Sequence, residues 1–190
     1  VLWVFGVTVL ILNFSPFFSL NLNTISMIVS ILSILIAFLW SRFEKSWWRH
    51  EKINKLLPSS LSTPVLEGRW EGTLIREGEP HDFAIEIIQT FTTISCKTFS
   101  KNSYSVSIAA DFIYDEQHDD HRLFYLWEGK TKNAGTEAEE TNKFTGVTLL
   151  NVNSNQMKLI GEYFTNRQPK QTRGSISVSF QQKELKHSFL

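Results

Sequence analysis

The sequence predicts a membrane α-hairpin joined to an all-β domain, a compact antiparallel up-and-down β-barrel of about eight strands. The first observation is charge, because residues 1–41 contain none of the 19 Lys and Arg or the 19 Asp and Glu side chains. The second is periodicity, since apolar and polar residues alternate from residue 65 onward, as in strands. We expect a two-helix transmembrane hairpin, a juxtamembrane helix and linker, a cytoplasmic ligand-binding barrel and a C-terminal tail, at residues 1–41, 42–64, 65–183 and 184–190 respectively.

Residues 1–20 and 24–40 form two apolar runs, each near the roughly 20 residues that a helix needs to cross a bilayer. Lipid offers the backbone no hydrogen-bond partners, so both runs are expected to be helical. A cleaved signal peptide is the less favoured interpretation, because no basic region and no small-residue cleavage site is visible. The sequence begins at Val1 and not at Met, so we expect additional N-terminal residues and treat two spans as a minimum.

Basic residues follow the second apolar run and predict its orientation. They outnumber Glu44 and Glu51 in the same stretch, and the positive-inside rule places such an end in the cytoplasm. Within the run, three serines spaced i, i+4 and i+7 share a helix face and predict a seam for helix association. The basic residues are Arg42, Lys45, Arg49, Lys52 and Lys55, and the serines are Ser26, Ser30 and Ser33.

Eight strands are expected in the second part, each rich in β-branched and aromatic residues and bounded by short polar turns. Closing them into a barrel removes the exposed edges of an open sheet, and eight strands leave room inside for one small ligand. A β-sandwich is the alternative. The expected strands are residues 67–76, 82–89, 92–100, 103–115, 121–130, 143–150, 156–165 and 173–180.

Alternation within these strands predicts which side chains share a face. In the fourth strand it groups Val106, Ile108, Ala110 and Phe112, and in the seventh it groups residues 157, 159, 161, 163, 165 and 167. Gly68-Arg69-Trp70 and the late Arg173 resemble the Gly-x-Trp and Arg of lipocalin-type barrels. That resemblance implies that Arg173 stacks on Trp70 and closes one end of the barrel.

The chemical motifs of an enzyme are missing from the sequence. It contains no nucleotide-binding glycine loop and no spacing typical of a Ser-His-Asp triad. His118 and His121 lie in an acidic segment between two strands, which is more typical of a solvated turn than of a metal site. The single Cys96 falls in mid-strand and is expected to be a buried thiol. We therefore expect no enzymatic activity, no metal and no cofactor.

The segment 161–174 predicts a ligand site, because it combines an aromatic-rich strand with a basic loop. Guanidinium and ammonium groups bind phosphates, and aromatic faces stack on nucleobases. A basic turn beside a buried tyrosine is the purely structural alternative. The predicted ligand-binding residues are Tyr163, Thr165, Arg167 and Arg173, with Arg76, Trp127 and Lys130 as second choices.

The chain also resembles a known family. Two membrane spans followed by a barrel, with Leu66-Glu67-Gly68-Arg69-Trp70-Glu71-Gly72 at its start and Gly161-Glu162-Tyr163-Phe164-Thr165 with Thr172-Arg173-Gly174 near its end, resemble bacterial CBASS antiphage effectors of the SMODS-associated two-transmembrane, β-strand-rich type. These proteins are also called the CD-NTase-associated protein 15 family.

The resemblance implies a receptor-effector in the bacterial inner membrane, with its barrel in the cytoplasm. A cognate nucleotidyltransferase would make a cyclic dinucleotide during phage infection. Binding would drive homo-oligomerisation of the spans and disrupt the lipid bilayer, causing abortive infection. No nucleic acid polymer is expected as a partner. The alternative is a membrane-tethered, lipocalin-like barrel that binds another small molecule or a protein.

Overall fold

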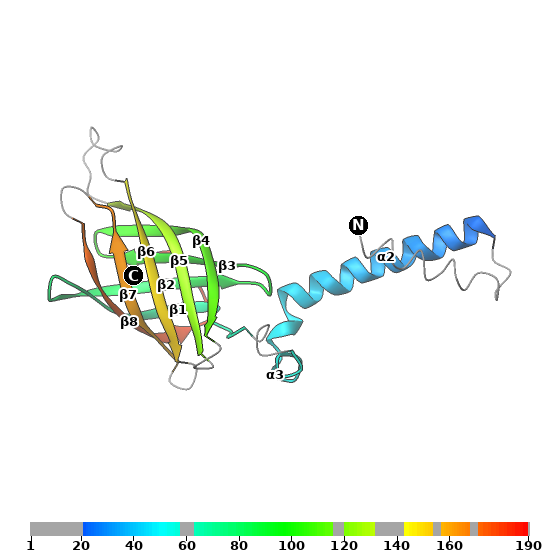
Figure 1. Ribbon diagram of the computed structural model, residues 1–190, viewed down its shortest axis with the longest axis horizontal. Helices are drawn as coiled ribbons and strands as arrows, with labels where there is room; N and C mark the ends of the chain where they lie inside the picture. The colour runs from blue at the N-terminus through cyan, green and yellow to red at the C-terminus, as the bar shows by residue number, and fades with distance from the viewer. Residues whose placement is uncertain are drawn as a thin grey trace. The chain divides into compact units, whose positions relative to one another are not determined.

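The computed structural model describes residues 21–57, 63–115, 120–131, 143–153, 157–167 and 171–189 (Figure 1). The chain divides into two compact units, Val1–His50 and Glu51–Leu190. The first predicted span, residues 1–20, and the acidic segment 132–142 lie outside the described residues.

The first unit contains a long apolar helix, α2 (Leu22–Lys45). Asn21 caps its N-terminus, since its side-chain oxygen accepts a hydrogen bond from the backbone N–H of Thr24 at 2.8 Å. The helix runs on past the predicted residue 40 and ends at Lys45, followed by the 3₁₀ turn η1 (Trp47–Arg49). In the second unit, the short helix α3 (Glu51–Asn54) precedes the barrel.

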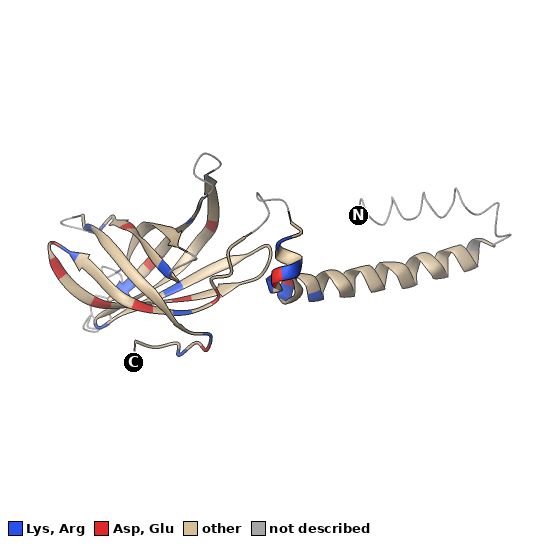
Figure 2. Cartoon of the chain, turned by 90° about the horizontal axis from the view of Figure 1, so that it is seen from below, with Lys and Arg blue, Asp and Glu red and all other residues tan. Residues whose placement is uncertain are grey.

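One helix of the described chain is long and apolar enough to cross a membrane. It covers Asn23–Lys45, with a mean hydropathy of 2.2 over its best window. The expectation of two spans is therefore met for one span only among the described residues, and the other falls on residues 1–20. Figure 2 shows that charged residues of α2 gather at its C-terminal end, where Arg42, Glu44 and Lys45 lie.

The second unit contains the eight predicted strands, and each lies within a few residues of its expected position. The strands are β1 (Gly68–Arg76), β2 (Glu79–Gln89), β3 (Ile94–Ser100), β4 (Ser103–Asp115), β5 (Asp120–Thr131), β6 (Lys143–Asn153), β7 (Lys158–Thr165) and β8 (Arg173–Gln182). Four strands, β2, β5, β6 and β8, begin before the prediction or extend beyond it, because their ends continue to pair with the neighbouring strands.

These strands form a closed antiparallel barrel in which each pairs with its neighbour in sequence and β8 pairs with β1 (Figure 1). The prediction of an up-and-down barrel is thus confirmed. Because the strands alternate in direction, the barrel has two distinct ends. We call the end near Arg76 and Thr165 the mouth, and the end near Trp70 and Gln89 the floor.

The floor is a packed apolar core. Trp70 is fully buried, with Phe180 edge-on against it at 5.3 Å between ring centroids, and its Nε1 donates to the carbonyl of Leu66 at 2.9 Å. The Gln89 side chain binds the segment that leads into β1. Its oxygen accepts a hydrogen bond from the backbone N–H of Leu66, and its amide nitrogen donates one to the carbonyl of Pro64. Most of the other inward residues here are aliphatic, among them Ile85, Ile87, Leu123, Leu150, Leu159 and Val178.

The expected stacking of Arg173 on Trp70 is wrong. Strands β1 and β8 are antiparallel, so the start of β8 lies beside the end of β1, where Arg76 pairs with Gly174. Trp70 pairs with Phe180 at the opposite end of β8. An aromatic ring therefore covers this tryptophan in place of a cation.

A β-bulge in β4 makes part of the predicted inward face of that strand wrong. The pairing with β5 shifts between Ser107 and Ala109, so that one extra residue separates them. Ala110 and Phe112 pack against the core as predicted, but Val106 and Ile108 are exposed. On the mouth side of the bulge, the serines of β4 take the inward positions instead, and Ser105 is buried.

The C-terminal tail packs on the outer wall of β1 and β2 through a buried ion pair. Arg69 and Glu86 are both fully buried and 2.8 Å apart. The Arg69 guanidinium donates to the carbonyls of Ser188 and Phe189, while Glu86 accepts from the backbone N–H groups of Lys186 and His187. Tail and barrel wall thus satisfy each other's charges and polar groups.

Candidate functional site

A cavity of about 480 Å³ occupies the mouth half of the barrel. This volume lies within the range of about 300–1,000 Å³ that is typical of small-molecule sites. The cavity ends where the packed floor begins, since Trp70 and its aliphatic neighbours belong to the core and do not line it. Residues from most of the strands face it, so the closed barrel itself fixes their positions.

Two arginines converge on the cavity from different strands. Arg76 ends β1, and Arg167 follows β7 with its guanidinium 4.2 Å from the ring centre of Phe144 and its Nη2 donating to Thr131 Oγ1 at 3.2 Å. Burial and the nearby charge of Arg76 lower the pKa of Arg167 from its ordinary value. Two like charges held together in a partly buried site favour an anion between them.

Tyr163 stands beside these arginines with its hydroxyl buried. Within the described residues that hydroxyl has no hydrogen-bond partner, although burying an unpaired hydroxyl costs about 1–3 kcal/mol. Burial raises the pKa of Tyr163, and the charges of Arg76 and Arg167 oppose this rise. The phenol is therefore neutral at physiological pH and can donate a hydrogen bond to a group in the cavity.

Each of the two predicted stacking aromatics pairs across the sheet with a glycine. Trp127 on β5 pairs with Gly146 on β6, and Tyr163 on β7 pairs with Gly174 on β8. A Cβ on Gly146 would lie 2.3 Å from the Trp127 ring, and one on Gly174 would lie 2.8 Å from the Tyr163 ring. The missing side chains let both rings lie against the barrel wall.

Hydroxyl groups complete the cavity wall. Thr148 Oγ1 accepts from Trp127 Nε1 at 2.9 Å, which fixes the indole ring. Thr98 and Ser105 join through their hydroxyls at 2.5 Å, and Thr165 and Thr172 do so at 2.7 Å. These groups can both donate and accept, so they suit the mixed donor and acceptor edges of nucleobases and ribose.

Five of the seven predicted ligand-binding residues line this one cavity: Arg76, Trp127, Tyr163, Thr165 and Arg167. Lys130 and Arg173 do not line it, and both are exposed. The inward residues of β5 are Tyr125, Trp127 and Gly129, so Lys130 points outward. Arg173 likewise precedes the inward Gly174 and Ile176 and faces the outer wall of β8.

The prediction from the sequence included Thr165 but not the other hydroxyl groups of the wall, nor two aromatic residues of the cavity, Tyr125 and Phe144. Tyr125 was detectable, because it shares the alternation phase of Trp127. The serines of β4 were assigned outward because the bulge at Ile108 shifts the phase of that strand, and alternation alone does not reveal a bulge. Thr148 shares the inward phase of Leu150 and Val152, but no inward face was derived from the sequence for that strand.

The three serines of the predicted helix seam lie on α2. Ser30 Oγ donates to the carbonyl of Ser26, and Ser33 Oγ donates to the carbonyl of Val29. Both hydroxyl protons are thus used within the helix, while the oxygens remain able to accept from a neighbouring helix. Their role in helix association stays a prediction.

The charges and aromatic rings that line the cavity favour a planar, anionic molecule. The other charged residues that line it, Asp82 and Lys101, have opposite signs, so the two arginines give it a positive balance.

Among the residues that the structure describes, no group of three or more His, Cys, Asp or Glu side chains could hold a metal ion. Cys96, the one cysteine of the sequence, is buried, and burial raises the pKa of its thiol.

Comparison with known proteins assigns the family. Residues 61–179 match the family described as "Cap15, cyclic dinucleotide receptor domain", a stretch that contains every residue lining the cavity except Phe189. CD-NTase-associated protein 15 of Yersinia aleksiciae is 26% identical over 144 residues, which cover 74% of this chain and 65% of that relative. The chain thus spans slightly less than two thirds of the relative's length. The resemblance predicted from the sequence is confirmed, and the chain belongs to the Cap15 cyclic dinucleotide receptor family.

Proposed function

We propose that the barrel cavity binds a cyclic dinucleotide and that the protein is the effector of a CBASS antiphage system. The observation that carries this proposal is the convergence of Arg76, Arg167 and two wall-lying aromatic rings in a cavity of about 480 Å³. A cyclic dinucleotide offers the matching groups, namely two phosphates and two bases. The family match, described as a cyclic dinucleotide receptor domain, supports the same ligand class.

The residues divide into three roles in this proposal. Arg76 and Arg167 bind a phosphate, since guanidinium groups bind phosphate with charge-assisted hydrogen bonds. Trp127 and Tyr163 give faces on which bases stack, and Tyr163 also donates its unpaired hydroxyl. The hydroxyl groups of the cavity wall then form hydrogen bonds with the ribose and with the edges of the bases. The pair Thr98 and Ser105 forms one part of this wall.

Ligand binding then drives assembly in the membrane. A ligand favours assembly only when it binds the assembly-competent state more tightly than the resting state. In this proposal the barrel lies in the cytoplasm, the chain spans the bacterial inner membrane more than once, and Ser26, Ser30 and Ser33 contribute to helix contacts. The clustered spans disrupt the bilayer, and the infected cell dies before the phage spreads. The protein acts as a receptor and carries out no catalysis.

The test is a thermal-shift screen of the full-length chain in detergent against cyclic dinucleotides and trinucleotides. A ligand at a hundredfold its dissociation constant adds about 2.7 kcal/mol to the free energy of unfolding. We expect a clear rise in melting temperature with one or a few cyclic dinucleotides. The corresponding linear dinucleotides are the matched control, because they carry the same bases without ring closure. A folded chain that shifts with none of the cyclic compounds contradicts the proposal.

A further inference from the structure

Phe144 lies between the two parts of the candidate site, the stacking rings and the arginines. It belongs to the first turn-side residues of β6 and lines the cavity. Trp127 meets its ring edge to face, with 5.7 Å between the ring centroids. The guanidinium carbon of Arg167 lies over the same ring, 4.2 Å from its centre. One side chain therefore contacts both the ring proposed to stack on a base and a cation proposed to bind a phosphate.

The backbone places Arg167 beside Phe144, because the segment after β7 stays attached to the start of β6. The N–H of Asn166 donates to the carbonyl of Thr145 at 2.9 Å. The N–H of Thr145 donates in return to Asn166 Oδ1 at 2.8 Å. Arg167 and Phe144 are the next residues on the two segments, and both line the cavity. Two hydrogen bonds thus fix the cation and the ring as cross-strand neighbours.

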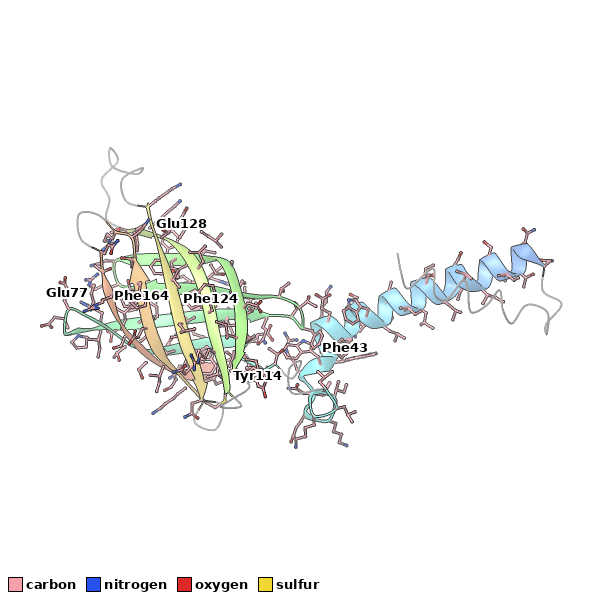
Figure 3. All side chains as sticks on the ribbon, in the orientation of Figure 1. Phe43, Glu77, Tyr114, Phe124, Glu128 and Phe164 are labelled. Atoms are coloured by element: carbon pink, nitrogen blue, oxygen red, sulfur yellow. The ribbon has the colours of Figure 1, made fainter. Side chains whose placement is uncertain are left out.

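Gly129 on β5 provides the space that Phe144 occupies. The two residues pair in register across β5 and β6. A Cβ on Gly129 would lie 2.9 Å from the Phe144 ring and 3.0 Å from the Trp127 ring. Figure 3 labels Glu128, the exposed residue that precedes this glycine on β5. The glycine therefore allows the two rings to meet at the barrel wall.

Without a ligand, the charge of Arg167 is held in an unfavourable place. The guanidinium is partly buried and lies near the charge of Arg76, which favours a side chain that turns away into solvent. Two contacts oppose that movement, the face of the Phe144 ring and the hydrogen bond from Nη2 to Thr131 Oγ1 at 3.2 Å. The bond to Thr131 uses one of several guanidinium donors, so others can still reach a phosphate.

We propose that Phe144 is a positioning residue, which holds the Arg167 guanidinium in place for a phosphate before the ligand arrives. The ring acts through the arginine and does not itself stack on the ligand. Ordering a flexible side chain on binding costs affinity, and a side chain that is already held avoids this cost. Because the same ring packs against Trp127, it also sets the phosphate-binding group relative to the stacking ring. This inference deepens the proposed function and rests on it.

The test is a double-mutant cycle in the full-length chain in detergent, measured by calorimetric titration with the cyclic dinucleotide that the screen selects. Phe144→Leu keeps an apolar side chain but removes the aromatic face. In the wild-type background it should raise the dissociation constant about three- to tenfold, the cost of ordering one long side chain. In the Arg167→Ala background it should change the constant by less than about twofold, because no guanidinium remains to be positioned. A loss that persists in that background shows that the ring contacts the ligand directly, which overturns the proposal.

Further variants separate positioning from a general loosening of the barrel. Phe144→Tyr keeps the aromatic face and should restore the wild-type dissociation constant to within about twofold. Phe112→Leu is the matched control, because Phe112 is also a partly buried phenylalanine but does not line the cavity. It should leave the dissociation constant unchanged, and a loss equal to that of Phe144→Leu overturns the proposal. Phe144→Met, which also lacks an aromatic face, takes the place of Phe144→Leu if the latter does not fold.

Inorganic pyrophosphate, titrated into the same variants, distinguishes this inference from the proposed function, because it carries phosphate groups without bases. A chain that binds no cyclic dinucleotide, but binds pyrophosphate with the same dependence on Phe144 and Arg167, keeps the positioning role and contradicts the proposed ligand. A chain that binds a cyclic dinucleotide with additive losses keeps the proposed function and overturns the positioning role. A folded chain that binds neither probe overturns both.

Discussion

The two ends of the barrel interior are built on opposite principles. At the floor, the polar groups of Trp70 and Gln89 are paired and the surrounding side chains fill the space. At the mouth, Arg76 and Arg167 repel each other, the Tyr163 hydroxyl is unpaired, and space remains. The floor therefore stabilises the fold without a ligand. The mouth retains an unfavourable charge repulsion and an unpaired hydroxyl group, both of which a bound ligand can relieve. The following predictions test that division.

The largest effect is expected at the floor, from Trp70→Ala. The substitution leaves a cavity beneath Phe180 and removes the hydrogen bond to the Leu66 carbonyl, so it should lower the free energy of unfolding by about 3–5 kcal/mol. Chemical denaturation of the full-length chain measures this. If the loss is below about 1 kcal/mol, the floor is not the stabilising part of the barrel.

At the mouth, Arg167→Ala should weaken ligand binding without weakening the fold. A hydrogen bond to a charged group contributes about 1.5–3 kcal/mol, so the dissociation constant should rise at least about tenfold. The melting temperature of the free protein should change little, because removal of the repulsion from Arg76 offsets the loss of the hydrogen bond to Thr131 and of the contact with Phe144. Calorimetric titration and a melt of the free protein measure the two quantities. Loss of stability together with affinity would instead assign Arg167 a structural role.

A smaller effect is expected from Tyr163→Phe, which removes only the hydroxyl. Because that hydroxyl has no partner in the described structure, the free protein should be as stable as the wild type or slightly more so. Ligand affinity should fall about three- to tenfold through loss of one neutral hydrogen bond. A variant that melts earlier without ligand would show that the hydroxyl is already paired.

The smallest effect is expected from Arg173→Ala, which serves as the matched control for Arg167→Ala. Arg173 has the same charge and lies only six residues after Arg167, at the start of β8, but it faces outward from that strand. Stability should change by no more than about 0.5 kcal/mol, and affinity should stay at the wild-type value. A loss of affinity equal to that of Arg167→Ala would show that long-range charge, and not contact within the cavity, governs binding.

Much of this division was predictable from the sequence, and the errors have identifiable causes. Alternation and turn residues located all eight strands, because a strand with one buried face must show a period of two. The same alternation places Lys130 and Arg173 outward, since Trp127 and Ile176 face inward, although the positive charge of both residues favoured a phosphate-binding role. The bulge at Ile108 and the Arg69–Glu86 contact with the tail depend on three-dimensional packing. No local pattern in the sequence encodes them.

The closed floor also has a consequence for timing. Within the described barrel, the cavity ends at Trp70 and its neighbours, so a ligand must leave by the route through which it arrived, past Arg76 and Arg167. Differences in affinity among related complexes lie mostly in the dissociation rate. A cavity with a single entrance lengthens the time for which a ligand stays bound, without needing a larger contact area. If the barrel binds a messenger as proposed, the bound state outlasts a brief pulse of that messenger, and the response follows the accumulated signal more than its momentary concentration.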